Sequence, residues 1–140
     1  MKLPPPAATS QTGFSLVELL VTMAIVATLA GVAVPSYIDY MRRGAVEEAV
    51  AALASGKIAA EQFYLDNRTY DGLPCPADTS KFTFICTGDS KSYALTAKGT
   101  GNVSGFLYTL DEADNHTSSS GDEWGRDGVC WILRKGQTCP

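Results

Sequence analysis

The sequence has few of the residues that catalytic and metal sites use. Its only histidine is His116, which we expect in a surface loop. The four cysteines form no C-x-x-C pair, which argues against zinc-binding and thioredoxin-like sites. We find no G-x-S-x-G motif, no glycine-rich phosphate loop and no histidine paired with a carboxylate. The sequence therefore predicts no catalytic residue, no metal site, no cofactor and no enzymatic activity.

Positive charge is also in short supply. Eleven Lys and Arg residues stand against fifteen Asp and Glu residues, which gives a formal net charge of −4 at pH 7. A chain with this balance does not attract nucleic acid through its bulk charge. DNA is possible as a partner only through a local basic patch, for which Arg134 and Lys135 are candidates.

The acidic residues gather towards the carboxy terminus. Between positions 111 and 127 they are Asp111, Glu112, Asp114, Asp122, Glu123 and Asp127, with only Arg126 against them. Calcium loops follow the pattern D-x-[DN]-x-[DN]-G, which this stretch does not match. We therefore expect a solvated loop here rather than a calcium site.

A long apolar run stands near the start of the chain. Residues 16–34 read LVELLVTMAIVATLAGVAV, about the number of residues that cross a bilayer as a helix. Glu18 is the only ionisable residue in this run, and such a residue is a functional-site hypothesis that needs a partner. A conventional secretory signal, cut after residues 31–33, is the alternative. The length of the run, Glu18 itself and a head that carries only Lys2 argue against it.

Cleavage after Gly13 would supply a partner for Glu18. The new amino terminus on Phe14 would stand four residues before Glu18, on the same face of a helix. Its ammonium group could pair with Glu18 of the same chain or of a neighbouring chain. The alternative is that the carboxylate only favours a helix amino terminus.

A second helical segment follows Pro35. Gly31 and Pro35 weaken helical structure locally and predict a bend or partial melting, although Pro35 could also simply end a transmembrane helix. From Tyr37 to about Asp66, apolar residues recur at helical spacing. They are Val46, Ala49, Val50, Leu53, Ala60 and Tyr64. We predict one bent helix over residues 14–66.

The remainder of the chain changes to a period of two residues. Alternation predicts strands in residues 81–86, 92–97, 105–110 and 129–133, separated by turn-rich pieces that include 99–101 and 115–121. Such strands form a small antiparallel sheet with one buried face, here packed on the second half of the helix. Trp124 and Trp131 are expected to cap its core. The predicted fold class is therefore α+β.

The cysteines predict disulfides, because an even number follows an export segment. Cys75, Cys86, Cys130 and Cys139 allow three connectivities. Short local loops favour Cys75–Cys86 and Cys130–Cys139, while the other two pairings stay open.

The motif Gly13-Phe-Ser-Leu-Val-Glu18, together with Pro35, resembles the start of type IV pilins with a class III prepilin leader. Residues 92–97, 105–111 and 130–139 are similar to the carboxy-terminal half of PilE-type pilins. The resemblance implies the type IV pilin fold, a kink at Pro35 and pairing of Cys130 with Cys139. It also implies that a prepilin peptidase cuts after Gly13 and N-methylates Phe14, and that Phe14 and Glu18 direct subunit assembly.

This resemblance implies an organisation and a function. Residues 1–13 would be the leader, 14–66 the helix with its membrane and assembly segment at 14–35, and 67–140 the globular domain. The protein would wait in the inner membrane, where the assembly machinery joins it to other pilin subunits. The filament would then serve adhesion, twitching motility or DNA uptake at the cell surface. The alternatives are a minor pilin that binds DNA or a surface, and a type II secretion pseudopilin.

Overall fold

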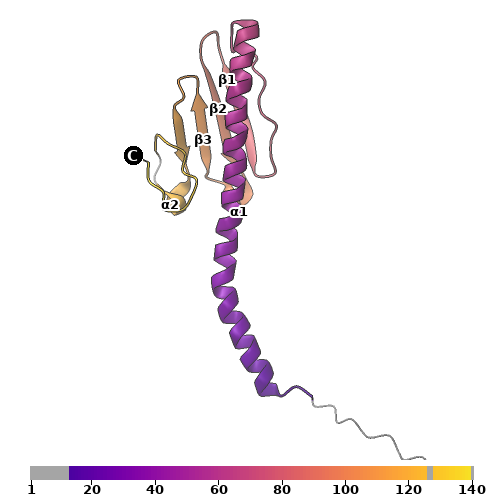
Figure 1. The fold of residues 1–140 in the computed structure, drawn as a ribbon. Coiled ribbons are helices and arrows are strands. Elements are labelled where there is room, and N and C mark those ends of the chain that lie inside the picture. The colour runs from indigo at the N-terminus through magenta and orange to yellow at the C-terminus, as the bar shows by residue number, and fades with distance from the viewer. Residues whose placement is uncertain (1–12, 126–127, 140) are drawn as a thin grey trace, which may run out of the picture. The chain divides into compact units, whose positions relative to one another are not determined.

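The computed structural model of the chain describes residues 13–125 and 128–139 (Figure 1). The chain divides into two compact units, residues 1–37 and 38–140. Helix α1, Leu16–Asn67, passes through both. It contains an 18-residue window of mean hydropathy 2.3, none of it buried, and is long and apolar enough to cross a membrane.

In the second unit, α1 packs on a sheet through one face. Its buried residues are Ala45, Val46, Ala49, Leu53, Gly56 and Ala60, which confirms the amphipathic pattern. Most of these side chains are small, so the helix lies close to its neighbours. A Cβ atom on Gly56 would stand 2.9 Å from Cγ of Pro76 and 3.1 Å from Cδ1 of Leu95. The helix ends at Asn67, where Arg68 takes a positive φ of 58°.

The sheet has four antiparallel strands in the order β1-β2-β3-β4. They are β1 Phe82–Gly88, β2 Tyr93–Gly99, β3 Leu107–Asp111 and β4 His116–Ser119, with a short 3₁₀ helix η1 at Gly101–Val103 and helix α2 at Gly121–Trp124. Figure 1 shows α1 crossing one face of this sheet. The fold is therefore α+β with a long helix on an antiparallel sheet, as predicted.

The face of the sheet towards α1 forms the core. Its buried strand residues are Phe82, Phe84, Tyr93, Leu95, Ala97, Tyr108 and Leu110. Phe106, which alternates with Tyr108 and Leu110, is buried just before β3. Trp124 is 1% exposed and lies edge-on to Phe106. Trp131 is half-buried against the same core.

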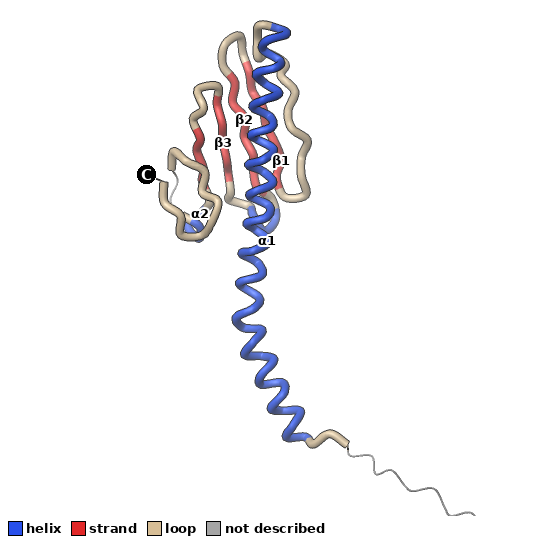
Figure 2. Tube along the Cα trace, viewed as in Figure 1, coloured by secondary structure: helices blue, strands red, loops and turns tan. Residues whose placement is uncertain are grey.

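The prediction for the last strand is wrong. Residues 129–133 form no strand and are drawn as loop in Figure 2, whereas β4 lies at His116–Ser119, inside the stretch predicted to be a turn. The loop after it is held to Ser118 of β4 by a bridge to Gly128 and by the serine hydroxyl. The Ser118 hydroxyl bonds to the backbone of Cys130 and Ile132, where the hydrogen bonds of a strand ladder would otherwise continue. Residues 129–133 are therefore a loop, although their sequence alternates like that of a strand.

The sheet face opposite α1, called the outer face below, is polar and partly exposed. It consists of Thr83, Ile85, Thr87, Ala94, Thr96, Lys98, Leu107, Thr109, Asp111, Thr117 and Ser119. Thr96 pairs with Ile85 on one side and Thr109 on the other, and Thr109 pairs with Thr117. β-Branched residues of this kind favour strands, so the composition of the outer face is compatible with the sheet.

Candidate functional site

The predicted cleavage and assembly residues lie at the start of α1. Gly13, Phe14 and Ser15 precede the helix, and the Ser15 carbonyl accepts the first helical hydrogen bond from Leu19 N at 3.1 Å. Phe14 is 81% exposed, and Glu18 lies exposed in the first turn. Since Phe14 still carries its peptide bond to Gly13, its amine does not exist in the uncut chain. Pairing of Phe14 with Glu18 therefore stays a prediction.

Gly31 and Pro35, the predicted kink residues, both lie inside α1. Proline has no N–H to donate to the carbonyl four residues earlier, and here that carbonyl belongs to Gly31. The missing hydrogen bond and the flexible residue thus coincide within one helical turn. The helical assignment is continuous across them, and bending or partial melting of this segment stays a prediction.

Both favoured disulfides are present, which confirms the pairing expected from the short loops. Cys75–Cys86 and Cys130–Cys139 each join Cα atoms 5.5 Å apart. The first attaches the segment after α1 to strand β1. The second closes the carboxy-terminal loop, here defined as residues 130–139.

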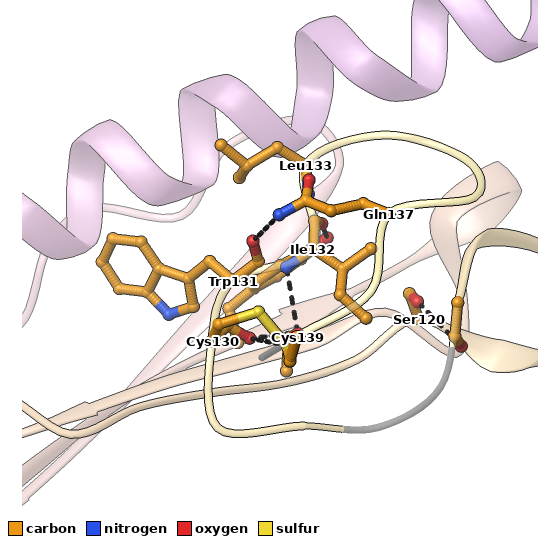
Figure 3. The surroundings of a disulfide bond; sticks show 10 residues. Ser120, Cys130, Trp131, Ile132, Leu133, Gln137 and Cys139 are labelled. Carbon is orange, nitrogen blue, oxygen red and sulfur yellow. Dashed lines mark hydrogen bonds between the residues drawn. A yellow bond between two sulfur atoms is a disulfide. The ribbon is translucent and has the colours of Figure 1, made fainter.

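Side chains that the sequence did not single out order the carboxy-terminal loop (Figure 3). The Gln137 amide donates to the Trp131 carbonyl and accepts from Leu133 N, both at 3.0 Å. The Ser118 hydroxyl donates to the Cys130 carbonyl at 2.7 Å and accepts from Ile132 N at 3.1 Å. No residue pattern marks Ser118 or Gln137 in advance, because their partners are backbone groups distant in the sequence or in a loop.

Three tyrosines lie together where α1 ends. Tyr70 stacks on Tyr64 with ring centroids 4.6 Å apart and lies 4.7 Å from Tyr93. The Tyr93 hydroxyl donates to Glu61 at 3.4 Å. Burial, reinforced by the Glu61 charge, raises the pKa of Tyr70 and Tyr93 above the usual range, and burial raises that of Tyr108. These groups therefore stay neutral at physiological pH and serve packing.

The β3–β4 turn and the end of β3 contain Asp111, Glu112 and Asp114, three of the acidic residues for which the sequence predicted a solvated loop rather than a calcium site. Asp127 lies outside the described residues. The Asp111 carboxylate accepts hydrogen bonds from Ala113 N, Asn115 N and Asn115 Nδ2, at 2.9–3.0 Å. Asp114 accepts from Lys57 of α1. The hydrogen bonds to Asn115 and Lys57 hold the pKa of Asp111 and Asp114, respectively, below the usual range. Among the described residues no group of His, Cys, Asp and Glu is arranged to hold a metal ion.

His116 lies in strand β4 rather than in the predicted surface loop. Its Nε2 is 3.6 Å from Asp114, and its ring meets Trp131 edge-on at 4.3 Å. The Trp131 indole N–H in turn donates to the Thr109 carbonyl at 3.1 Å. The histidine thus joins the β3–β4 turn to the carboxy-terminal loop.

Basic side chains are distributed unevenly over the domain. Lys98 is exposed on the outer face, where it pairs with Thr83 and Leu107, and Lys81 directly precedes β1. Lys81 stands two positions before Thr83, the partner of Lys98 in the register. Such diagonal neighbours lie within reach of long side chains, so these two cations lie near each other and are called the lysine pair below. The predicted candidates differ: Arg134 is exposed, but Lys135 lies 3.8 Å from Asp39. The lysine pair escaped prediction because the two residues are 17 positions apart.

A leader-type motif, a helix long and apolar enough to cross a membrane, and a helix-on-sheet domain with two disulfides fit a membrane-anchored α+β protein. Residues 35–132 match the family described as type IV minor pilin ComP, DNA uptake sequence receptor. Residues 9–34 match the prokaryotic N-terminal methylation motif. The chain therefore belongs to the type IV pilin family.

Individual relatives agree with this assignment. The chain is 36% identical over 95 residues to a type IV major pilin protein PilE1 of Neisseria gonorrhoeae, covering 64% of this chain and 58% of the relative. A fimbrial protein of Neisseria meningitidis is 36% identical over 95 residues, covering 64% and 55%. One of Pseudomonas aeruginosa is 39% identical over 70 residues, covering 50% and 46%. The chain thus spans about half the length of the relatives it matches.

Proposed function

We propose that this protein is a minor subunit of a type IV pilus that binds DNA for uptake. The observation that carries the proposal is the match of residues 35–132, which include most of the globular domain, to a family of DNA uptake sequence receptors. The match of residues 9–34 to the methylation motif supports pilin-type processing. Adhesion and twitching would be functions of the filament as a whole.

The same proposal assigns the parts of the chain. Residues 1–13 are a leader that prepilin peptidase removes after Gly13 before N-methylation of Phe14. Residues 14–35 hold the mature protein in the inner membrane until the assembly machinery joins it to other pilins. Residues 14–66 form the helix, and residues 67–140 form the domain that the filament displays at the cell surface.

Assembly is tested through Glu18. Replacing Glu18 with Ala or Val leaves the helix apolar, so the protein should still enter the membrane. Removing one member of a buried charge pair typically costs about 3–5 kcal/mol, and incorporation into filaments should fall sharply. The measurement is the ratio of this chain in sheared filaments to this chain in membranes. A Glu18 variant found in filaments at the wild-type ratio would refute the pairing.

The lysine pair supports a DNA-binding surface on the outer face. Lys81 and Lys98 stand there among threonine and serine hydroxyls, and Asp111 is the one acid among the outer-face residues. Lysine, serine and threonine are among the side chains that contact phosphate oxygens of DNA. A local excess of positive charge of this kind can attract DNA although the whole chain is acidic.

Salt dependence of duplex binding tests this surface. Lys81→Ala and Lys98→Ala should each weaken binding to all sequences and lower the slope of log K against log salt by about 0.9, as expected for one lost phosphate contact. Lys91→Ala is the matched control, because Lys91 is exposed in the β1–β2 turn beside Asp89. Equal slopes for wild type and both variants would exclude the outer face as the DNA contact.

A further inference from the structure

Apolar side chains surround α1 where it leaves the domain. Ile38, Tyr40 and Met41 are 41%, 70% and 45% exposed. Successive residues turn by about 100° around a helix, so these three point in different directions. None of the three belongs to the core of the described domain, whose first core residues on α1 are Ala45 and Val46.

Positive charge follows these apolar residues directly. Asp39 is paired with Lys135 at 3.8 Å. Arg42 donates from Nε to the Asn102 carbonyl at 2.8 Å, and Arg43 is exposed. The next acids, Glu47 and Glu48, come one turn later. The segment therefore combines three exposed apolar side chains with an exposed cation, and these four residues are called the collar below: Ile38, Tyr40, Met41 and Arg43.

The collar is close to the membrane segment by chain connectivity alone. Ile38 comes four residues after Val34, the last residue of the apolar run. Even a fully extended chain of this length spans only about 14 Å. If the apolar run lies in a bilayer, as the proposed function requires, the collar lies within reach of the headgroup layer. Tyrosine is enriched at that depth, and arginine extends its charge to the headgroups.

We infer that the collar is a docking surface for the headgroup layer of an anionic phospholipid membrane. Tyr40, Ile38 and Met41 lie at the boundary between acyl chains and headgroups, and the Arg43 guanidinium binds a lipid phosphate. Arginine suits this role because its planar fork matches phosphate oxygens. A neighbouring helix covers one face of a helix, whereas Ile38, Tyr40 and Met41 are exposed in different directions, as contact with a surrounding lipid layer requires.

The test places the full-length chain, isotopically labelled, in nanodiscs of phosphatidylcholine and phosphatidylglycerol at about 3:1. A nitroxide is attached to the headgroup of either lipid in separate samples, and paramagnetic broadening of backbone amide signals is measured. We expect strong broadening at residues 38–43 and little at residues 89–91 of the β1–β2 turn. Broadening by the anionic tracer should exceed that by the zwitterionic tracer about fivefold.

Matched variants isolate the arginine. With Arg43→Gln, the anionic and zwitterionic tracers should broaden the signals of residues 38–43 equally. Lys91 is an exposed cation in the β1–β2 turn, so Lys91→Gln should leave the fivefold preference for the anionic tracer unchanged. Equal broadening by both tracers in the wild type would overturn the anionic preference. Signals of residues 38–43 that no headgroup tracer broadens would overturn membrane docking altogether. Broadening of these signals only by added spin-labelled duplex DNA, or only by an added spin-labelled second subunit, would overturn it as well.

A third tracer separates this inference from the proposed function on which it rests. A nitroxide deep in the acyl chains should broaden residues 16–34. If residues 16–34 are broadened while the signals of residues 38–43 stay sharp with headgroup tracers, docking of the collar is refuted and the proposed membrane anchor is supported. If residues 16–34 also stay sharp, the anchor itself fails.

Discussion

Two strand glycines lie where a methyl group would overlap the backbone of another segment. A Cβ atom on Gly88 would meet the Tyr70 carbonyl, and one on Gly99 would meet the Val103 carbonyl. In contrast, a Cβ atom on Gly44 of α1 would meet nothing within 4 Å. At the residue scale, close backbone approach rather than turn geometry explains Gly88 and Gly99.

We therefore expect Gly88→Ala and Gly99→Ala each to lower the free energy of unfolding by about 1–3 kcal/mol, the usual cost of overpacking. Gly44→Ala is the matched control and should raise it by roughly 0.5–1 kcal/mol through helix propensity. Denaturant unfolding of the detergent-solubilised protein with its disulfides intact measures all three. A neutral Gly88→Ala would mean that the 70–73 segment yields without cost.

The role of Ser118 depends on a single atom, its hydroxyl oxygen. Its hydroxyl serves two backbone groups of the carboxy-terminal loop, the Cys130 carbonyl and Ile132 N. Ser118→Ala leaves both without this partner and should cost about 2–3 kcal/mol. Ser119→Ala, on the outer face next to it, should change the free energy of unfolding by less than about 0.5 kcal/mol. Equal effects of the two substitutions would show that the hydroxyl is dispensable.

At the scale of elements, the two disulfides close loops of similar length at different places. The cysteines are separated by 11 residues in Cys75–Cys86 and by 9 residues in Cys130–Cys139. Loop entropy then predicts a loss of roughly 3 kcal/mol when either is removed. The structural consequences should differ, because only the second loop contains Trp131 and the contacts to Ser118.

Paired Cys→Ser variants test this difference. Removing Cys130–Cys139 should free Trp131 from the Thr109 carbonyl and from His116, and so shift its fluorescence to longer wavelength in the folded protein. Removing Cys75–Cys86 should leave the emission unchanged while lowering stability by a similar amount. A spectral shift in both variants would show that the two loops are coupled.

At the scale of the whole molecule, pH should act on stability from two sides. Hydrogen bonds from backbone and side chains keep the pKa of Asp89, Asp111 and Asp114 below the usual range. Carboxylates of this kind stabilise the fold above their unfolded pKa, near 3.9, and that stability is lost as pH falls through the lower folded values. The three residues lie in the two turns at one end of the sheet, so acid should loosen that end first.

The tyrosines act in the opposite direction. Burial raises the pKa of Tyr70, Tyr93 and Tyr108, so their contribution is complete below about pH 10, the unfolded value, and is lost as pH rises above it. We expect a melting temperature that is flat near neutrality and falls below about pH 4 and above about pH 10. Tyr108→Phe should reduce the alkaline fall, and Asp114→Asn the acid fall. A flat profile at either extreme would contradict the corresponding assignment.

The sequence by itself determined the features that follow from local pattern. The membrane-length run with Glu18, the amphipathic second half of α1 and the alternation in β1, β2 and β3 are all readable because spacing along the chain fixes which face a side chain takes. The favoured cysteine pairs are local for the same reason. These features were sufficient to indicate the family.

Features formed by residues that are distant in the sequence could be seen only in the tertiary structure. Strand β4 was missed because His-Thr-Ser-Ser carries no apolar alternation, and it exists because its backbone pairs with β3 and Ser118 holds the loop beyond it. The Lys81–Lys98 pair depends on strand register. The collar depends on where the core of the domain begins along α1, since exposure of Ile38, Tyr40 and Met41 follows from what the sheet leaves uncovered.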